Sequence, residues 1–234
     1  YRSIRATLQP IAKPAVEYPK YEELVHNGEI SFYLFFGATE YLTKGNETPA
    51  TSTDIGAVQF RDFRDKQLLA QQFRLIGRQN NSNFEVNHWV KEINKIKVTV
   101  HTYFGNTSLG SEKSFRFHEL YFEAMKSSSV MVFSGHSSFG ESLDLDKLGN
   151  MLNKDFLGAL NKEQYQIFYF MACNSYSYYN DFYLKLKENS GKLDVLSVGL
   201  ISWAERDYGN MGTLLEAVLS WAEGKEKKTW EDIR

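Results

Sequence analysis

The sequence lacks the residues on which several kinds of protein depend. It holds one cysteine, Cys173, in 234 residues, which excludes an internal disulfide and a cysteine-rich zinc site. Its 27 basic and 29 acidic residues give a formal net charge of −2, so no charge excess marks a surface for nucleic acid or for an anionic membrane. No apolar run approaches the ~18 residues that a membrane span needs. We therefore expect neither a nucleic-acid partner nor a membrane span.

The composition that is present is typical of one globular α/β domain. Hydrophobic residues make up 42% of the chain and charged residues 24%, and the length is sufficient to bury one core. Three of the four prolines fall within residues 1–28, which favours an N-terminal arm or linker there and a single domain over residues 29–234. The first residue is tyrosine rather than methionine, so we expect that residues have been removed and that the protein is secreted or periplasmic.

Two short apolar runs in the middle of the chain each lead into a reactive side chain. Val130–Phe133 is followed by His136, and Ile167–Met171 is followed by Cys173. A continuous apolar run bounded by Gly, Ser or Asn is typical of a strand that is buried on both faces of a parallel sheet. Such sheets collect their chemistry at the carboxyl ends of the strands, where this pattern places His136 and Cys173.

The segment between the two runs predicts a helix, because its apolar residues recur at helical spacing. These residues are Leu143, Leu145, Leu148, Met151 and Leu152. The whole segment therefore reads as strand, helix, strand. A right-handed crossover of this kind places its two strands side by side or nearly so, which brings the imidazole and the thiol to one edge of the sheet.

Hydrophobic patterns elsewhere predict the remaining elements of the domain. We expect strands over residues 30–36, 98–105 and 195–203, a turn over 80–83, and helices over 60–76, 84–94, 115–125 and 212–222. A strand near the end of the segment 60–76 is an alternative there.

His101 lies inside one expected strand, and no metal-ligand spacing surrounds it. We interpret it as a packed or hydrogen-bonded residue. The run over residues 174–180 is both polar and rich in tyrosine. These tyrosines either cap the edge of the core or line a peptide-binding cleft beside Cys173, since amphipathic rings suit both positions.

The expected elements from Val130 to Cys173 follow one another in a specific order. A hydrophobic strand ends in His136, a short helix follows, and a second hydrophobic strand ends in Ala172 and Cys173. This order resembles the caspase-like cysteine peptidases of clan CD, which include caspases, metacaspases, clostripain, gingipains, legumain and the CHAT domains. The strand and helix expected downstream are similar to those that follow the cysteine in CHAT domains. The resemblance covers residues 30–234 and is strongest from Val130 onward. It implies an α/β fold, a three-layer αβα sandwich with a mostly parallel central sheet.

The resemblance also implies a cysteine endopeptidase that cleaves peptide bonds through a thioester acyl-enzyme. Cys173 would be the nucleophile and His136 its base and acid, because a thiol with a pKa of about 8.5 needs help to ionise at neutral pH. Backbone N–H groups of Cys173 and Ser137 would hold the oxyanion, although relatives usually carry glycine where Ser137 stands. We expect no cofactor, and no metal site, since Asp207 alone would be an incomplete ligand set.

Two alternatives to the peptidase stay open. Ser137 in the glycine position favours a catalytically inactive caspase-like binding or signalling module, whereas the presence of both His136 and Cys173 favours the enzyme. The other alternative is an acyltransferase or hydrolase that uses the same two residues on a non-peptide substrate, because a fold alone does not fix a reaction.

In caspases, metacaspases and clostripain, the residue two positions before the nucleophile helps to bind a charged substrate side chain. Here that residue is Met171, which has no charge. A charged substrate side chain would need its partner from another strand end, where Glu205 and Glu40 are the candidates. We expect a substrate-binding site walled by Trp203 that accepts Lys or Arg through Glu205 or Glu40. An uncharged pocket is the main rival.

Overall fold

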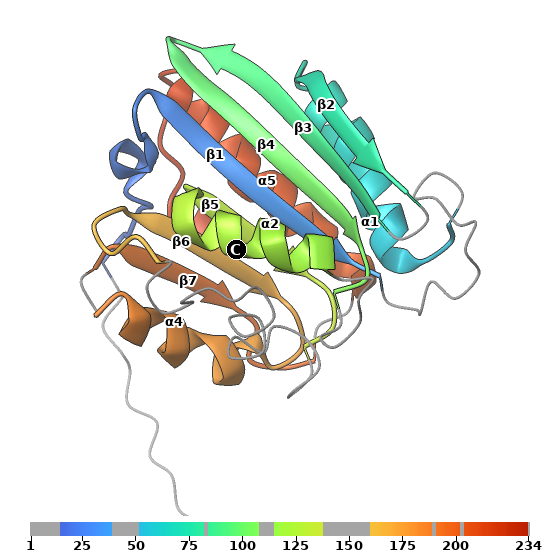
Figure 1. Ribbon diagram of the computed structural model, residues 1–234. Helices are drawn as coiled ribbons and strands as arrows, with labels where there is room; N and C mark the ends of the chain where they lie inside the picture. The colour runs from blue at the N-terminus through green and yellow to red at the C-terminus, as the bar shows by residue number, and fades with distance from the viewer. Residues whose placement is uncertain are drawn as a thin grey trace, which may run out of the picture.

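A computed structural model describes residues 15–38, 52–81, 84–107, 115–137, 160–188, 191–201 and 204–233, with the backbone alone for 204–208. Within these residues seven strands form one sheet, in the order β2-β3-β4-β1-β5-β6-β7 (Figure 1). The strands are β1 Glu29–Gly37, β2 Arg74–Asn80, β3 Phe84–Ile93, β4 Ile96–Gly105, β5 Val130–Ser134, β6 Gln166–Met171 and β7 Leu193–Ser197.

The sheet is mostly parallel. β1 pairs in parallel with β4 on one side and with β5 on the other, and β5, β6 and β7 continue in the same direction. β2 and β3 form an antiparallel hairpin that extends the sheet beyond β4. The ends of β4, β1, β5, β6 and β7 therefore meet on one side of the sheet, which we call the carboxyl edge.

Helices cover both faces of the sheet, so the domain has three layers (Figure 1). One face packs against α1 (Ile55–Phe63), the π-helix η2 (Arg64–Leu69) and α5 (Ala204–Ala222). The other face packs against α2 (Phe115–Ser127), the π-helix η4 (Tyr176–Asn180) and α4 (Asp181–Leu186). The predicted α/β architecture with a mostly parallel sheet is confirmed.

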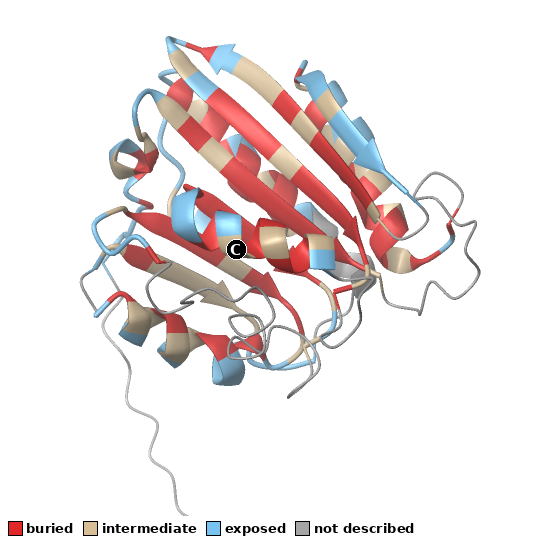
Figure 2. Cartoon of the chain, viewed as in Figure 1, coloured by how far each residue is buried: buried red, intermediate tan, exposed pale blue. Residues whose placement is uncertain are grey.

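Burial on both faces explains why the central strands are apolar throughout rather than alternating (Figure 2). In β1, Phe32 and Phe36 pack toward α1 and α5, while Tyr33 and Phe35 pack toward α2. All four side chains are buried. Aromatic rings supply much of this contact, because each buries a large apolar area.

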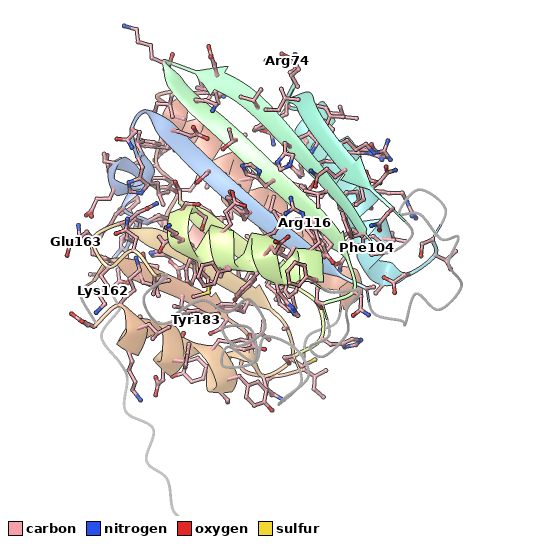
Figure 3. All side chains as sticks on the ribbon, viewed as in Figure 1. Arg74, Phe104, Arg116, Lys162, Glu163 and Tyr183 are labelled. Atoms are coloured by element: carbon pink, nitrogen blue, oxygen red, sulfur yellow. The ribbon has the colours of Figure 1, made fainter. Side chains whose placement is uncertain are left out.

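A buried pair of tyrosines connects α2 to α4 on one face of the sheet. Tyr183 projects from α4, where Figure 3 labels it, and its ring stacks on Phe170 of β6 with centroids 5.1 Å apart. Its hydroxyl lies 2.6 Å from that of Tyr121 on α2, and both side chains are fully buried. Each hydroxyl thereby satisfies the other, as a buried polar group requires.

The helix predicted over residues 84–94 is wrong, since this segment is the strand β3. It pairs with β4 through a tight turn at Asn94 and Lys95, whose φ angles are 48° and 68°. Two successive positive φ angles are typical of the type I′ turn that suits a β-hairpin. The alternation of β3 was hidden because polar Glu85 and Asn87 are buried on one face, where an apolar residue would have marked the strand.

The segment over residues 60–76 is helical only in its first part, and the strand that was the alternative near its end is present. Helical structure runs from Ile55 through η2 and ends at Leu69, and the strand β2 begins at Arg74. β2 is exposed along nearly its whole length (Figure 2), so it carries no apolar period of its own that sequence reasoning could detect. A register shift between Leu75 and Gly77 disturbs its pattern further.

The other predicted elements in the described residues are present, although two of them have bounds that differ by six to eight residues. The strands expected at 30–36 and 98–105 and both runs around His136 and Cys173 are confirmed, as is the helix at 115–125. The strand expected at 195–203 is β7, which already ends at Ser197, and the helix expected at 212–222 begins at Ala204. The helix predicted from Leu143 to Leu152 and part of the turn at 80–83 lie outside the described residues.

The segment before β1 packs against the C-terminal end of the chain. It contains the 3-10 helix η1 (Tyr21–Leu24), whose first and last side chains, Tyr21 and Leu24, are buried in the core. The Tyr21 ring stacks on Trp221 with centroids 5.7 Å apart, and its hydroxyl donates to the Lys228 carbonyl at 2.8 Å. The N–H of Trp230, at the start of α6 (Trp230–Ile233), donates to the Glu17 carbonyl at 2.9 Å.

Candidate active site

His136 and Cys173 follow neighbouring strands at equivalent positions. β5 and β6 are paired in parallel, and the last pair in register is Ser134 with Met171. His136 and Cys173 each lie two residues beyond that pair, at the carboxyl edge. The prediction that a crossover places these two strands side by side is therefore confirmed.

Gly135 allows the end of β5 to approach the end of β1 closely. A Cβ atom at this position would lie 3.0 Å from the Phe133 ring and 3.4 Å from the Cα of Gly37. The closer of these two contacts is with the edge of the Phe133 ring, so a larger residue at position 135 would have to displace that ring. Gly135, directly before His136, is thus packed between this ring and the end of β1.

The two candidate residues are accessible to different degrees. His136 is exposed and Cys173 is half-buried. A nucleophile and its base must both be reachable by a substrate, and a fully buried thiol would be inert. The arrangement satisfies this requirement.

The turn that contains Cys173 is fixed to the segment that follows β7. Asn174 has a φ of 53°, in the left-handed region that asparagine tolerates better than most residues. Its N–H donates to the Leu200 carbonyl at 2.9 Å, and the N–H of Tyr176 donates to the Val198 carbonyl at 3.1 Å. The chain beyond β7 thereby flanks Cys173.

The buried Ser175 side chain makes hydrogen bonds that hold the same turn in place. This side chain is fully buried, its hydroxyl donates to the Phe170 carbonyl at 2.9 Å, and it accepts the N–H of Val198 at 2.8 Å. One hydroxyl therefore joins the end of β6 to the end of β7. Nothing in the local sequence indicates this role, since Val198 is distant in the chain.

Ser137 connects the histidine segment to the cysteine turn. Its hydroxyl donates to the carbonyl of Cys173. The resemblance assigns a role in the oxyanion hole to the Ser137 backbone N–H, and the side-chain contact is separate from that role. The serine thus brings a link that glycine in the same position could not make.

The other residues expected at the site fall in different places. Met171 ends β6 with its side chain in the core under α1 and α5, at 3% exposure. Glu205 belongs to the first turn of α5, and its side chain is not among those described. Trp203 and Glu40 lie outside the described residues, as does the side chain of Asp207.

The tyrosines after Cys173 differ in burial. Tyr179 is buried against Phe170, with ring centroids 4.8 Å apart, and burial raises the pKa of its hydroxyl. Tyr176 and Tyr178 are exposed. Tyr179 thus caps the core, and the other two are left at the surface near Cys173.

Within the described residues, no group of three or more His, Cys, Asp or Glu side chains is placed to hold a metal ion. In that same part of the chain no helix is both long enough and apolar enough to cross a membrane. No protein-family description matches the chain, and neither does any curated protein.

Proposed function

We propose that this chain is a cysteine endopeptidase of the caspase-like kind, in which Cys173 is the nucleophile and His136 its general base and acid. The observation that carries the proposal is the parallel register of β5 and β6, which brings the two residues to equivalent positions at one edge. The three-layer α/β architecture is compatible with the caspase-like fold that the sequence resemblance implies.

The proposed reaction begins with transfer of the Cys173 thiol proton to His136. The thiolate then attacks the carbonyl carbon of the scissile peptide bond, and a C–S bond forms as the carbonyl oxygen takes the negative charge. When the carbonyl reforms, the C–N bond breaks and His136 gives its proton to the departing amine. Water, deprotonated by His136, attacks the thioester and releases the carboxylic acid and the free thiol.

The oxyanion needs hydrogen-bond donors that are already in position before the reaction. We assign this role to the backbone N–H groups of Cys173 and Ser137. Two neighbouring segments would then each donate a hydrogen bond to the same oxygen. The hydrogen bonds that hold the Cys173 turn, from Asn174 and Ser175, fix one of these segments and support the assignment.

A mechanism-based probe tests the proposal directly. Because Cys173 is the only cysteine, every thiol adduct reports on it alone. We expect the native chain to form a one-to-one adduct with a peptidyl acyloxymethyl ketone, seen by intact-mass spectrometry. The urea-unfolded chain should react with iodoacetamide and not with the ketone, since the ketone needs the assembled site.

A peptide-library cleavage assay completes the test, with Cys173→Ala as the control. Removal of one small sulfur leaves the fold intact in most proteins, so this variant should keep its circular dichroism spectrum and lose all cleavage. Cleavage that persists in Cys173→Ala contradicts the proposal. A native chain that neither reacts with the ketone nor cleaves any peptide supports the inactive binding module instead, for which the serine at position 137 is the argument.

A further inference from the structure

Four exposed apolar or aromatic side chains lie on the two segments that flank Cys173. Leu200 is 78% exposed, Ile201 68%, Tyr176 59% and Tyr178 38%. We call these four residues the apolar surface. Water contact with branched aliphatic side chains is unfavourable, so exposed ones on the segments beside a candidate nucleophile are candidates for contact with a substrate.

The hydrogen bonds of the Cys173 turn place this surface beside the thiol. Asn174 bonds to Leu200 and Tyr176 bonds to Val198, which is an antiparallel arrangement. Asn174 is adjacent to Cys173 in the chain, so the backbone of Leu200 lies beside the cysteine turn, and Ile201 follows it directly.

The described part of the carboxyl edge offers no charge to a substrate side chain. Apart from His136, no ionisable acid or base other than tyrosine and the thiol occurs in residues 36–38, 104–107, 134–137, 170–178 and 197–201. Asp54, a buried carboxylate just before α1, accepts the N–H groups of Gly56 and Ala57. A charged substrate side chain would lose water here without gaining a partner from these segments.

We infer that the apolar surface receives the side chain of the substrate residue on the N-terminal side of the cleaved bond, the P1 residue, and that this residue is a branched aliphatic or an aromatic one. The inference rests on the proposed peptidase function and names its substrate class. Contact with Leu200 and Ile201 buries apolar area on both partners. The charged end of a Lys, Arg, Asp or Glu side chain at P1 gains no such burial.

The experiment is a fluorogenic peptide library in which only the P1 residue varies. We expect kcat/KM for Leu, Ile, Val, Phe and Tyr to exceed that for Lys, Arg, Asp and Glu by at least ~10-fold, the scale on which an apolar site discriminates. A double variant, Leu200→Ser with Ile201→Ser, should lower kcat/KM for the apolar substrates to a similar extent. Its reaction with iodoacetamide, which reads only the thiol, should stay as in the wild type.

A matched control comes from β2, the strand at the far end of the sheet from β7. Leu75 and Ile76 on β2 are exposed at 43% and 53%, and β2 and β7 are at opposite ends of the strand order. Leu75→Ser with Ile76→Ser should leave the P1 profile and kcat/KM unchanged. An equal loss in this control and in the Leu200, Ile201 variant would contradict the inference, because the loss would then be unrelated to the site.

The outcomes separate this inference from the function on which it rests. An active enzyme that prefers Lys or Arg overturns the apolar preference, leaves the peptidase standing, and supports the role predicted for Glu205 or Glu40. A preference for Asp or Glu also overturns it. A chain that forms no ketone adduct and cleaves no peptide overturns both proposals together.

Discussion

The Nδ1 atoms of His88 and His101 lie 2.5 Å apart, across the pair of residues that joins β3 to β4. One ring must donate and the other accept, so the contact requires at least one neutral imidazole. His101 also stacks on Tyr33, with ring centroids 4.3 Å apart. The interpretation of His101 as a packed, hydrogen-bonded residue is confirmed, and the pair fastens the β2–β3 hairpin to the parallel part of the sheet.

This histidine pair predicts that stability falls in mild acid. Burial lowers the pKa of His101 to about 4, and burial together with the nearby charge of Arg116 lowers the pKa of His88. The unfolded chain, with histidine near 6.5, therefore binds more protons than the folded chain between pH 6.5 and 4. The free energy of unfolding should drop as the pH falls through this window, by up to about 1.4 kcal/mol per pH unit for one histidine.

Urea denaturation at pH 7 and pH 4.5 measures this loss. His101→Phe keeps a ring against Tyr33 and removes the titrating group, so its stability should depend less on pH than that of the wild type. An unchanged pH dependence in His101→Phe would show that other groups, such as the carboxylates, cause the acid sensitivity.

Sequence reasoning could predict the parallel strands and the positions of His136 and Cys173 because both faces of the sheet are buried. Continuous apolar runs such as Val130–Phe133 then identify a strand without help from its neighbours. The strand β3 was missed, and β2 was foreseen only as an alternative, for the opposite reason. Glu85 is buried there because Arg78 and Asn87 bond to its carboxylate, and that compensation is visible only in three dimensions.

The links around Cys173 were also beyond prediction. The Ser175 hydroxyl bridges Phe170 and Val198, and no periodicity or motif relates a serine to a residue 23 positions away. The apolar surface was missed because Leu200 and Ile201 extend a run that reads as the continuation of a buried strand. The strand ends at Ser197, and these two side chains are left exposed.

His136→Ala should lower kcat by ~10²- to 10⁴-fold while KM changes little, because general acid-base help is lost and substrate contacts are kept. In the plot of kcat against pH, the limb that is caused by ionisation of the His136 imidazole should disappear. Steady-state kinetics with the best peptide substrate from pH 5 to 9 provide the measurement. A variant that keeps the wild-type pH profile would assign the role of base to another residue.

Ser175→Ala should destabilise the fold and slow turnover. The substitution removes the acceptor of the Val198 N–H and the donor to the Phe170 carbonyl in a fully buried place, which costs about 1–3 kcal/mol. Ser177→Ala, two residues further and exposed, is the control and should unfold like the wild type. Equal unfolding free energies for the two variants would show that the Ser175 hydroxyl does not hold the turn.

Ser137→Ala should lower kcat by a smaller factor, ~2- to 10-fold, with KM nearly unchanged. Its hydroxyl donates to the Cys173 carbonyl, so its loss frees the turn that carries the nucleophile without removing a group that touches the substrate. The loss of one partly exposed hydrogen bond costs about 0.5–1.5 kcal/mol, which sets this range. Ser137→Thr keeps the hydroxyl and should recover much of the rate, which a purely steric role for Ser137 would not predict. Ser137→Gly introduces the residue usual in the resembling family, and a kcat above that of the wild type would show that the Ser137 hydroxyl hinders catalysis.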